Sequence, residues 1–234
     1  MPAPTRLQTA LVLIHQNARP TELAGMARFG IGGEGRLGLS VPAMRGIARV
    51  LGREHALALA LWDTSIPDAR IVAALVAEPV RLTSRQMDAW VKGFASWDVC
   101  DQTCLNAFCD SPLAWRKVKA WSGRQDEFVR RAAFALLATL AVHDKQASDA
   151  VFIDALVLVE AAAGDQRKLV RKAVNWALRN IGKRNPVLHR AAVDTAQRIR
   201  LQGSTSARWI AADALRELAS PAVQKRLQAK TAPH

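Results

Sequence analysis

Apolar residues recur at helical spacing along nearly the whole chain. Between 167 and 183 they fall on one helical face, formed by Val170, Ala173, Val174, Ala177, Leu178 and Ile181. Proline, glycine and serine mark short breaks between such blocks, as at Asn185-Pro186 and Ser220-Pro221. No stretch alternates convincingly between apolar and polar residues, as a half-buried strand does. The pattern therefore predicts an all-α protein.

The predicted helices follow one another through short loops. They cover residues 5–16, 20–27, 41–51, 54–62, 67–78, 84–95, 97–108, 112–122, 126–142, 147–163, 166–183, 186–201, 205–219 and 221–229. Two helices form a unit that recurs at roughly 40 residues, which is typical of HEAT-like antiparallel helix pairs. Such pairs stack into an α-α superhelix, a curved solenoid whose concave surface is lined by one helix of each pair. A compact helix bundle is the alternative.

We expect one repeat domain over residues 1–234, beginning with N-terminal helices in 1–28. A glycine-rich connection follows at 30–40, where residues 29–38 contain five glycines. A phosphate-binding glycine loop lies between a strand and a helix. Because no strand precedes this segment, we predict a flexible connection.

The charge points to a polyanionic partner. Lys and Arg number 33 against 20 Asp and Glu, which gives a net charge of +13. Nucleic acid is the first expectation and an anionic membrane surface the second. No apolar run reaches membrane-spanning length, and the first residues lack the pattern of a signal peptide. We therefore expect a cytoplasmic protein.

Cysteine and histidine usage gives no metal site. The three cysteines, Cys100, Cys104 and Cys109, fall within one predicted helix, and the five histidines are scattered. Buried free thiols in a reducing compartment are the expected outcome. Neither a metal-binding motif nor a nucleophile elbow occurs, so we expect no cofactor.

The segment 96–101 carries the first candidate site. Ser96 is a plausible N-cap, and Asp98 would sit in the first helical turn, where the helix dipole favours a negative charge. Asp101 shares a face with Trp97 and with three apolar residues, Cys104, Leu105 and Phe108. A carboxylate there is costly unless it is paired. Asp101 is therefore either satisfied by a cap or ion pair, or it serves a site that needs a negative charge beside an indole.

Basic residues surround a second tryptophan. Trp176 lies off the apolar stripe, among Lys172, Arg179 and Lys183. It either makes an inter-repeat contact, such as a cation–π stack with Arg179, or forms a platform facing DNA. Arg131 points away from the apolar stripe of its helix, so it suits a phosphate contact. The predicted DNA contacts are Arg45, Arg131, Lys172, Arg179, Lys183 and Arg208. We interpret the other tryptophans, Trp62, Trp90, Trp115, Trp121 and Trp209, as mainly structural.

Four segments resemble motifs of the bacterial DNA alkylation repair enzymes, the alkylpurine DNA glycosylases of AlkD type. Residues 97–101 resemble a W-D-x-V-D motif. Residues 62–70, 128–133 and 171–179 resemble three further motifs, in the family's order. The resemblance spans roughly residues 28–219. The chain departs from the family in its glycine-rich segment, in Asp68 where Glu is usual, and in Phe128 where Trp is usual.

The resemblance implies an array of HEAT-like repeats that holds duplex DNA in a concave cleft. The family removes purines with a cationic alkyl adduct, such as 3-methyladenine and 7-methylguanine, without a metal and without base flipping. By this resemblance Asp101 is the catalytic aspartate, and Trp97 and Trp176 contact the sugar of the damaged nucleotide. Arg131 is then the arginine that binds the DNA backbone.

The chemistry of these residue types agrees with the resemblance. A carboxylate stabilises a sugar that becomes cationic, and indole faces favour a cation. Two alternatives stay open: a non-catalytic relative that binds branched or distorted DNA, and a protein-binding scaffold. We expect a bacterial cytoplasmic monomer associated with the nucleoid.

Overall fold

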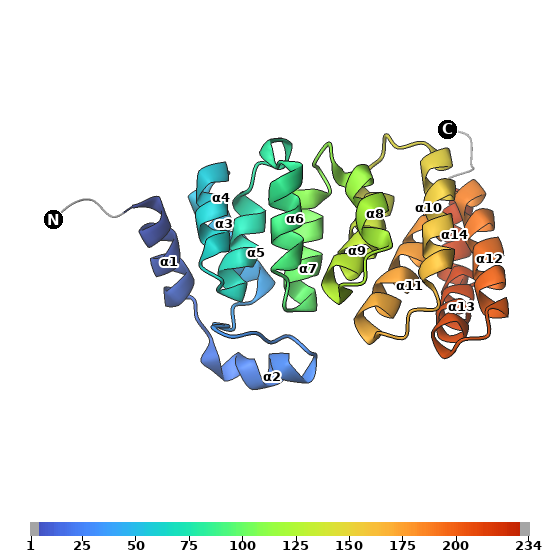
Figure 1. Cartoon of the computed structure of the whole chain (residues 1–234), viewed down its shortest axis with the longest axis horizontal. Helices are drawn as coiled ribbons and strands as arrows, with labels where there is room; N and C mark the ends of the chain where they lie inside the picture. Colours follow the sequence, from blue (N-terminus) through green and yellow to red (C-terminus); the bar gives the residue numbers. More distant parts are fainter. Residues whose placement is uncertain (1–4, 230–234) are drawn as a thin grey trace. The chain divides into compact units, whose positions relative to one another are not determined.

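The computed structural model describes residues 5–229, and this part of the chain contains fourteen α-helices and no strand (Figure 1). The prediction of an all-α protein is confirmed. The chain divides into two compact units, Met1–Leu113 and Ala114–His234, which we call unit 1 and unit 2. A single repeat domain over the whole chain stays a prediction.

Unit 1 is built on a row of three helices, α3, α5 and α7, with α5 packed between the other two. The helices of this unit are α1 (Arg6–Gln16), α2 (Leu23–Arg28), α3 (Val41–Leu51), α4 (His55–Asp63), α5 (Pro67–Val76), α6 (Ser84–Lys92) and α7 (Trp97–Thr103). The indoles of Trp62 and Trp90 stack with ring centroids 4.2 Å apart. The edge of Phe94 meets Trp62 at 5.8 Å. This buried cluster confirms the structural interpretation of Trp62 and Trp90 and joins α4 to α6.

Unit 2 has two layers of helices. Its helices are α8 (Ala114–Ser122), α9 (Glu127–His143), α10 (Asp149–Ala162), α11 (Lys168–Gly182), α12 (Pro186–Leu201), α13 (Thr205–Leu218) and α14 (Pro221–Ala229). In one layer α9 packs on α11 and α11 on α13, whereas α8, α10 and α12 form the other. Helices that follow one another in sequence thus lie in opposite layers, as helix pairs require.

A structural repeat is visible in the hydrogen bonds of unit 2. Several bonds join partners 38 residues apart, among them Arg131 to Leu169, Asn175 to Asp213 and Arg198 to Glu160. The offset of 38 residues recurs between α9 and α11, between α11 and α13, and between α10 and α12, which indicates that each helix pair repeats the previous one along the chain. The period predicted from the sequence is thereby confirmed within unit 2.

The glycine-rich segment is fastened to unit 1 by a buried carboxylate. Asp68, in the first turn of α5, has no exposed surface. Its two oxygens accept the backbone N–H groups of Leu37 and Leu39, at 2.8 and 2.9 Å. The segment has no helix or strand, but its backbone is held in place. The prediction of a flexible connection stays a prediction, but the sequence pattern did not reveal that a distant carboxylate satisfies two amides of this segment.

Gly38 offers a local test of this arrangement. Its φ is +83°, and a Cβ built there would lie 2.3 Å from the carbonyl oxygen of Arg19. Gly38→Ala should therefore lower the free energy of unfolding by about 3 kcal/mol, since strain adds to a backbone clash. Gly35, with φ +72° and open space around it, is the matched control, and Gly35→Ala should cost about 1 kcal/mol. Urea unfolding of both variants measures the difference, and equal losses would contradict the close contact.

Candidate nucleic-acid interface

The start of α7 is locked by an ion pair. Ser96 occupies the predicted N-cap with extended backbone, but its hydroxyl donates to Asp98 instead of capping the helix. Asp98 accepts two hydrogen bonds from the guanidinium of Arg36, at 2.8 and 2.9 Å. The Arg36 side chain is 4% exposed and that of Asp98 13%. Asp98 therefore ties the glycine-rich segment to α7, beyond the dipole role predicted for it.

Trp97 is oriented by the end of α2. Its indole N–H donates to the carbonyl of Phe29 at 3.0 Å, and the indole is half-buried. The Phe29 side chain is 76% exposed. Since the neighbouring segment is held through Arg36 and Asp68, the position of this indole depends on residues far away in sequence.

Asp101 lies one helical turn after Trp97 on α7 and is half-buried. The i, i+4 spacing places both side chains on one face of the helix. The predicted helix over 97–108 changes character after Thr103: residues 104–108 form a π-helical turn, in which the N–H of Cys109 reaches the carbonyl of Cys104 at 2.9 Å. Cys104 and Phe108 are fully buried. Trp97 and Asp101 thus lie on the half-exposed face of α7, before the widened turn, while Cys104 and Phe108 of that turn point into the core.

The motif at 68–70 is structural in unit 1. Arg70 lies over the Trp62 ring, 5.1 Å from its centroid. Its guanidinium donates to the carbonyls of Trp62 and Gly93, at 3.2 and 2.7 Å. Burial lowers the pKa of Arg70, and the charge of Asp63 partly offsets this effect. These contacts brace the aromatic cluster.

In unit 2, polar contacts follow the line where α11 and α13 meet. The Arg171 guanidinium lies 4.7 Å from the centroid of the Trp209 ring. One turn later the Asn175 amide donates to Asp213 at 2.6 Å. The contact with Arg171 fits the interpretation of Trp209 as a mainly structural residue, but 37% of its surface is exposed.

The next turn holds two of the predicted DNA contacts. Arg179 and Lys183 both pair with Glu217, and Lys183 does so at 2.6 Å. Burial alone would raise the pKa of Glu217, but its bond to Lys183 and the charge of Arg179 hold that pKa below its ordinary value. Arg179 therefore pairs with Glu217 on α13. The arginine that stacks on an indole in unit 2 is Arg171, and the indole is that of Trp209.

Other predicted residues of unit 2 differ in exposure. Trp176 is half-buried, whereas Lys172 and Arg208 are exposed. In unit 1, Arg45 is exposed and lines a groove of about 670 Å³ together with Arg49 and Arg53. These positions leave Lys172, Arg208 and Arg45 accessible to a polyanion.

Arg131 corrects one expectation. Its side chain was expected to point to solvent, but the residue is 5% exposed and donates to the carbonyl of Leu169 at 2.7 Å. The reason is that α9 is packed by α8, α10 and α11, so that it is buried nearly all round. Helical periodicity alone cannot show that the face with Arg131 is buried. Small residues such as Ala135 and Ala138 let a neighbouring helix pack closely on that face, although they do not make it strongly apolar.

Two residues that shape the surroundings of Trp97, Phe29 and Arg36, were not predicted from the sequence, and Asp68 was noted only as a departure from a family motif. Phe29, Arg36 and Asp68 come from a helix end, a glycine-rich segment and a different helix. For Arg36 the only signal was its place in the glycine-rich segment, which is not specific. The cysteines, by contrast, are buried free thiols as predicted.

Residues 5–229 contain neither a membrane-spanning helix nor a metal-binding cluster. No helix in this range is long and apolar enough to cross a membrane. The same residues contain no group of three or more His, Cys, Asp or Glu side chains arranged to hold a metal ion.

The fold and the site together define a helical-repeat protein with a strongly basic composition and a tryptophan–aspartate pair on one helix. A family model described as DNA alkylation repair enzyme matches residues 12–218. The chain belongs to this family.

A solved structure confirms the HEAT-like fold. It has a TM-score of 0.76 and 20% sequence identity, over 94% of this chain and 95% of the other. That protein is described as one of a new family related to the HEAT-like repeat DNA glycosylases, with affinity for branched DNA structures. No curated protein matches the chain.

Proposed function

We propose that this protein is a DNA glycosylase that hydrolyses the N-glycosidic bond of cationic alkylated purines in duplex DNA, without flipping the base. The observation that carries the proposal is the pair formed by Trp97 and Asp101, one turn apart and half-buried on α7. Membership of the DNA alkylation repair family supports it. The expected substrates are 3-methyladenine and 7-methylguanine.

The reaction follows from the charge of the lesion. The bond between C1′ and the purine nitrogen breaks, and its electron pair neutralises the cationic base as it leaves. Positive charge then develops on the sugar, where the Asp101 carboxylate stabilises it electrostatically. Water adds to C1′ and loses a proton, and Asp101 positions this water. The products are the free base and an abasic site.

The remaining residues bind the DNA. Trp97 and Trp176 contact the sugar of the damaged nucleotide through their electron-rich faces, which favour a cation. Lys172, Arg179, Lys183, Arg45 and Arg208 contact the phosphate backbone, whereas Arg131 is left out because it is buried and its guanidinium donates to the carbonyl of Leu169. For Arg179 and Lys183 this role requires that phosphate compete with Glu217, whereas Lys172 is already accessible. The protein acts as a monomer in the bacterial cytoplasm.

Chromatography of bases released from methylated duplex DNA tests the proposal. We expect the protein to release 3-methyladenine or 7-methylguanine above the rate of spontaneous depurination. DNA with a neutral adduct such as O6-methylguanine is the control and should release no base, since its base carries no positive charge. Absence of release from all methylated substrates would refute the enzymatic function.

The second candidate is a non-catalytic protein that binds branched or distorted DNA. The likeness to a structure described as having affinity for branched DNA motivates it. Tight binding to a three-way junction, weak binding to a linear duplex and no base release would favour this candidate.

A further inference from the structure

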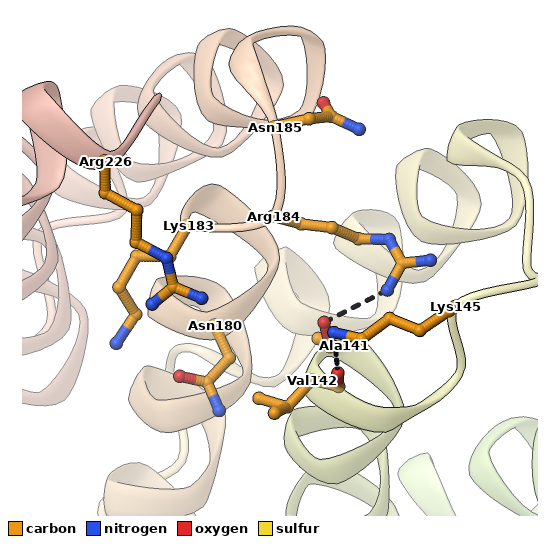
Figure 2. Close-up of a pocket in the computed structure, with 8 residues that line it drawn as sticks. All are labelled: Ala141, Val142, Lys145, Asn180, Lys183, Arg184, Asn185 and Arg226. Atoms are coloured by element: carbon orange, nitrogen blue, oxygen red, sulfur yellow. Dashed lines mark hydrogen bonds between the residues drawn. The ribbon is translucent and has the colours of Figure 1, made fainter. Parts of the chain in front are cut away.

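Unit 2 contains a basic pocket of about 410 Å³ at the C-terminal ends of α9 and α11. Four of its eight lining residues are cationic, namely Lys145, Lys183, Arg184 and Arg226 (Figure 2). Asn180, Asn185, Ala141 and Val142 complete the lining, which includes no acidic residue. The volume lies in the range of small-molecule sites.

Helix capping explains part of this cluster. Lys145 donates to the carbonyl of Val142. Arg184 donates to the carbonyls of Ala141 and Ala147, and both of these bonds measure 3.2 Å. Ala141 and Val142 belong to the last turn of α9, whose carbonyls lack helical partners. Cations at a helix C-terminus are also favoured by the helix dipole. These two residues therefore have a structural reason to be basic.

Arg226 lies in the last turn of α14, where the helix dipole also favours a cation, but it caps no carbonyl group. This residue extends from α14 toward the pocket, and it makes no hydrogen bond or ion pair with the residues that the structure describes. A guanidinium has five N–H donors, and an ammonium group has three, of which the capping bond of Lys145 uses one. The pocket therefore combines positive charge with unused donors from two separate segments.

Two acids bond to residues that line the pocket. Glu217 pairs with Lys183 and Arg179, and Asp149 accepts from the amide of Asn185. Glu217 thus neutralises Lys183, one of the four cations of the pocket, whereas Lys145 and Arg226 pair with no carboxylate among residues 5–229. Two such cations that face one pocket repel each other, and a bound anion relieves that repulsion. We propose that this pocket binds a phosphate-bearing anion, either a backbone phosphate of DNA or a free polyphosphate.

The test compares two neighbouring residues of α14. Arg226→Ala removes the unpaired guanidinium of the pocket, and Lys225→Ala removes an exposed cation that does not line it. Titration calorimetry with inorganic pyrophosphate should show binding to the wild-type protein and to Lys225→Ala. Arg226→Ala should bind at least about tenfold more weakly, because charge-assisted hydrogen bonds are lost. Lys145→Ala should reduce the affinity in the same direction.

A second arm uses an unmodified DNA duplex. If the pocket holds a backbone phosphate, Arg226→Ala should weaken duplex binding and lower the salt slope by about 1, while Lys225→Ala leaves both nearly unchanged. Selective loss of pyrophosphate binding alone identifies a free anion as the ligand. Equal behaviour of the two variants in both arms would overturn the proposal. Pyrophosphate binding is measured independently of base release. The anion-binding proposal can therefore hold even if the glycosylase proposal is refuted, and the reverse is also true.

Discussion

Asp101→Asn should lower the rate of 3-methyladenine release from methylated duplex DNA by about 10²- to 10³-fold. The amide has nearly the shape of the carboxylate but carries no negative charge to stabilise the cationic sugar. Binding to the duplex should stay within about twofold of wild type, since a carboxylate adds no attraction for phosphate. Single-turnover base release and fluorescence anisotropy measure the two quantities.

Asp110→Asn is the matched control for this substitution. It makes the same chemical change at an exposed residue shortly after the π-helical turn. It should leave base release unchanged. Full activity of Asp101→Asn would remove this carboxylate from the mechanism, and an equal loss in both variants would indicate a general charge effect.

Arg36→Met should lower the free energy of unfolding by about 3–5 kcal/mol, because it leaves the carboxylate of Asp98 without its buried partner. The substitution also removes the bond from Arg36 to the carbonyl of Gly32 at 3.2 Å, so the segment that precedes α3 loses both its tie to α7 and an internal hydrogen bond. Urea unfolding monitored by tryptophan fluorescence measures the loss.

A double variant separates the buried ion pair from general destabilisation. Arg36→Met combined with Asp98→Leu should recover at least half of the lost stability, since two apolar partners leave no unpaired charge. Arg81→Met is a control at the pair Arg81–Glu78, whose side chains are 59% and 33% exposed, and it should cost less than about 1 kcal/mol. If the double variant is as unstable as Arg36→Met, the ion pair is not the source of the effect.

Local sequence patterns predicted the helices well because helix formation depends on neighbouring residues. The breaks at Asn185-Pro186 and Ser220-Pro221 fall at the starts of α12 and α14. The apolar stripe of α11 is buried as its spacing required. The π-helical turn after Thr103 could not be predicted from such patterns. A π-helical turn contains one extra residue, and no particular residue type marks its position in the sequence.

Contacts between distant segments decided the surroundings of the candidate site. Arg36 and Asp98 are 62 residues apart, and Trp97 and Phe29 are 68 residues apart. No periodicity links such partners, because their pairing depends on where the folded helices place them.

The sequence by itself determined the all-α class, the helix-pair period, the basic character and the tryptophan–aspartate spacing on α7. These properties follow from composition and from distances of a few residues along one helix. Only the tertiary structure decided that Arg131 is buried, that Glu217 engages Arg179 and Lys183, and that carboxylates hold the glycine-rich segment. Burial and ion pairing depend on which helices become neighbours, and that information is spread over the whole chain.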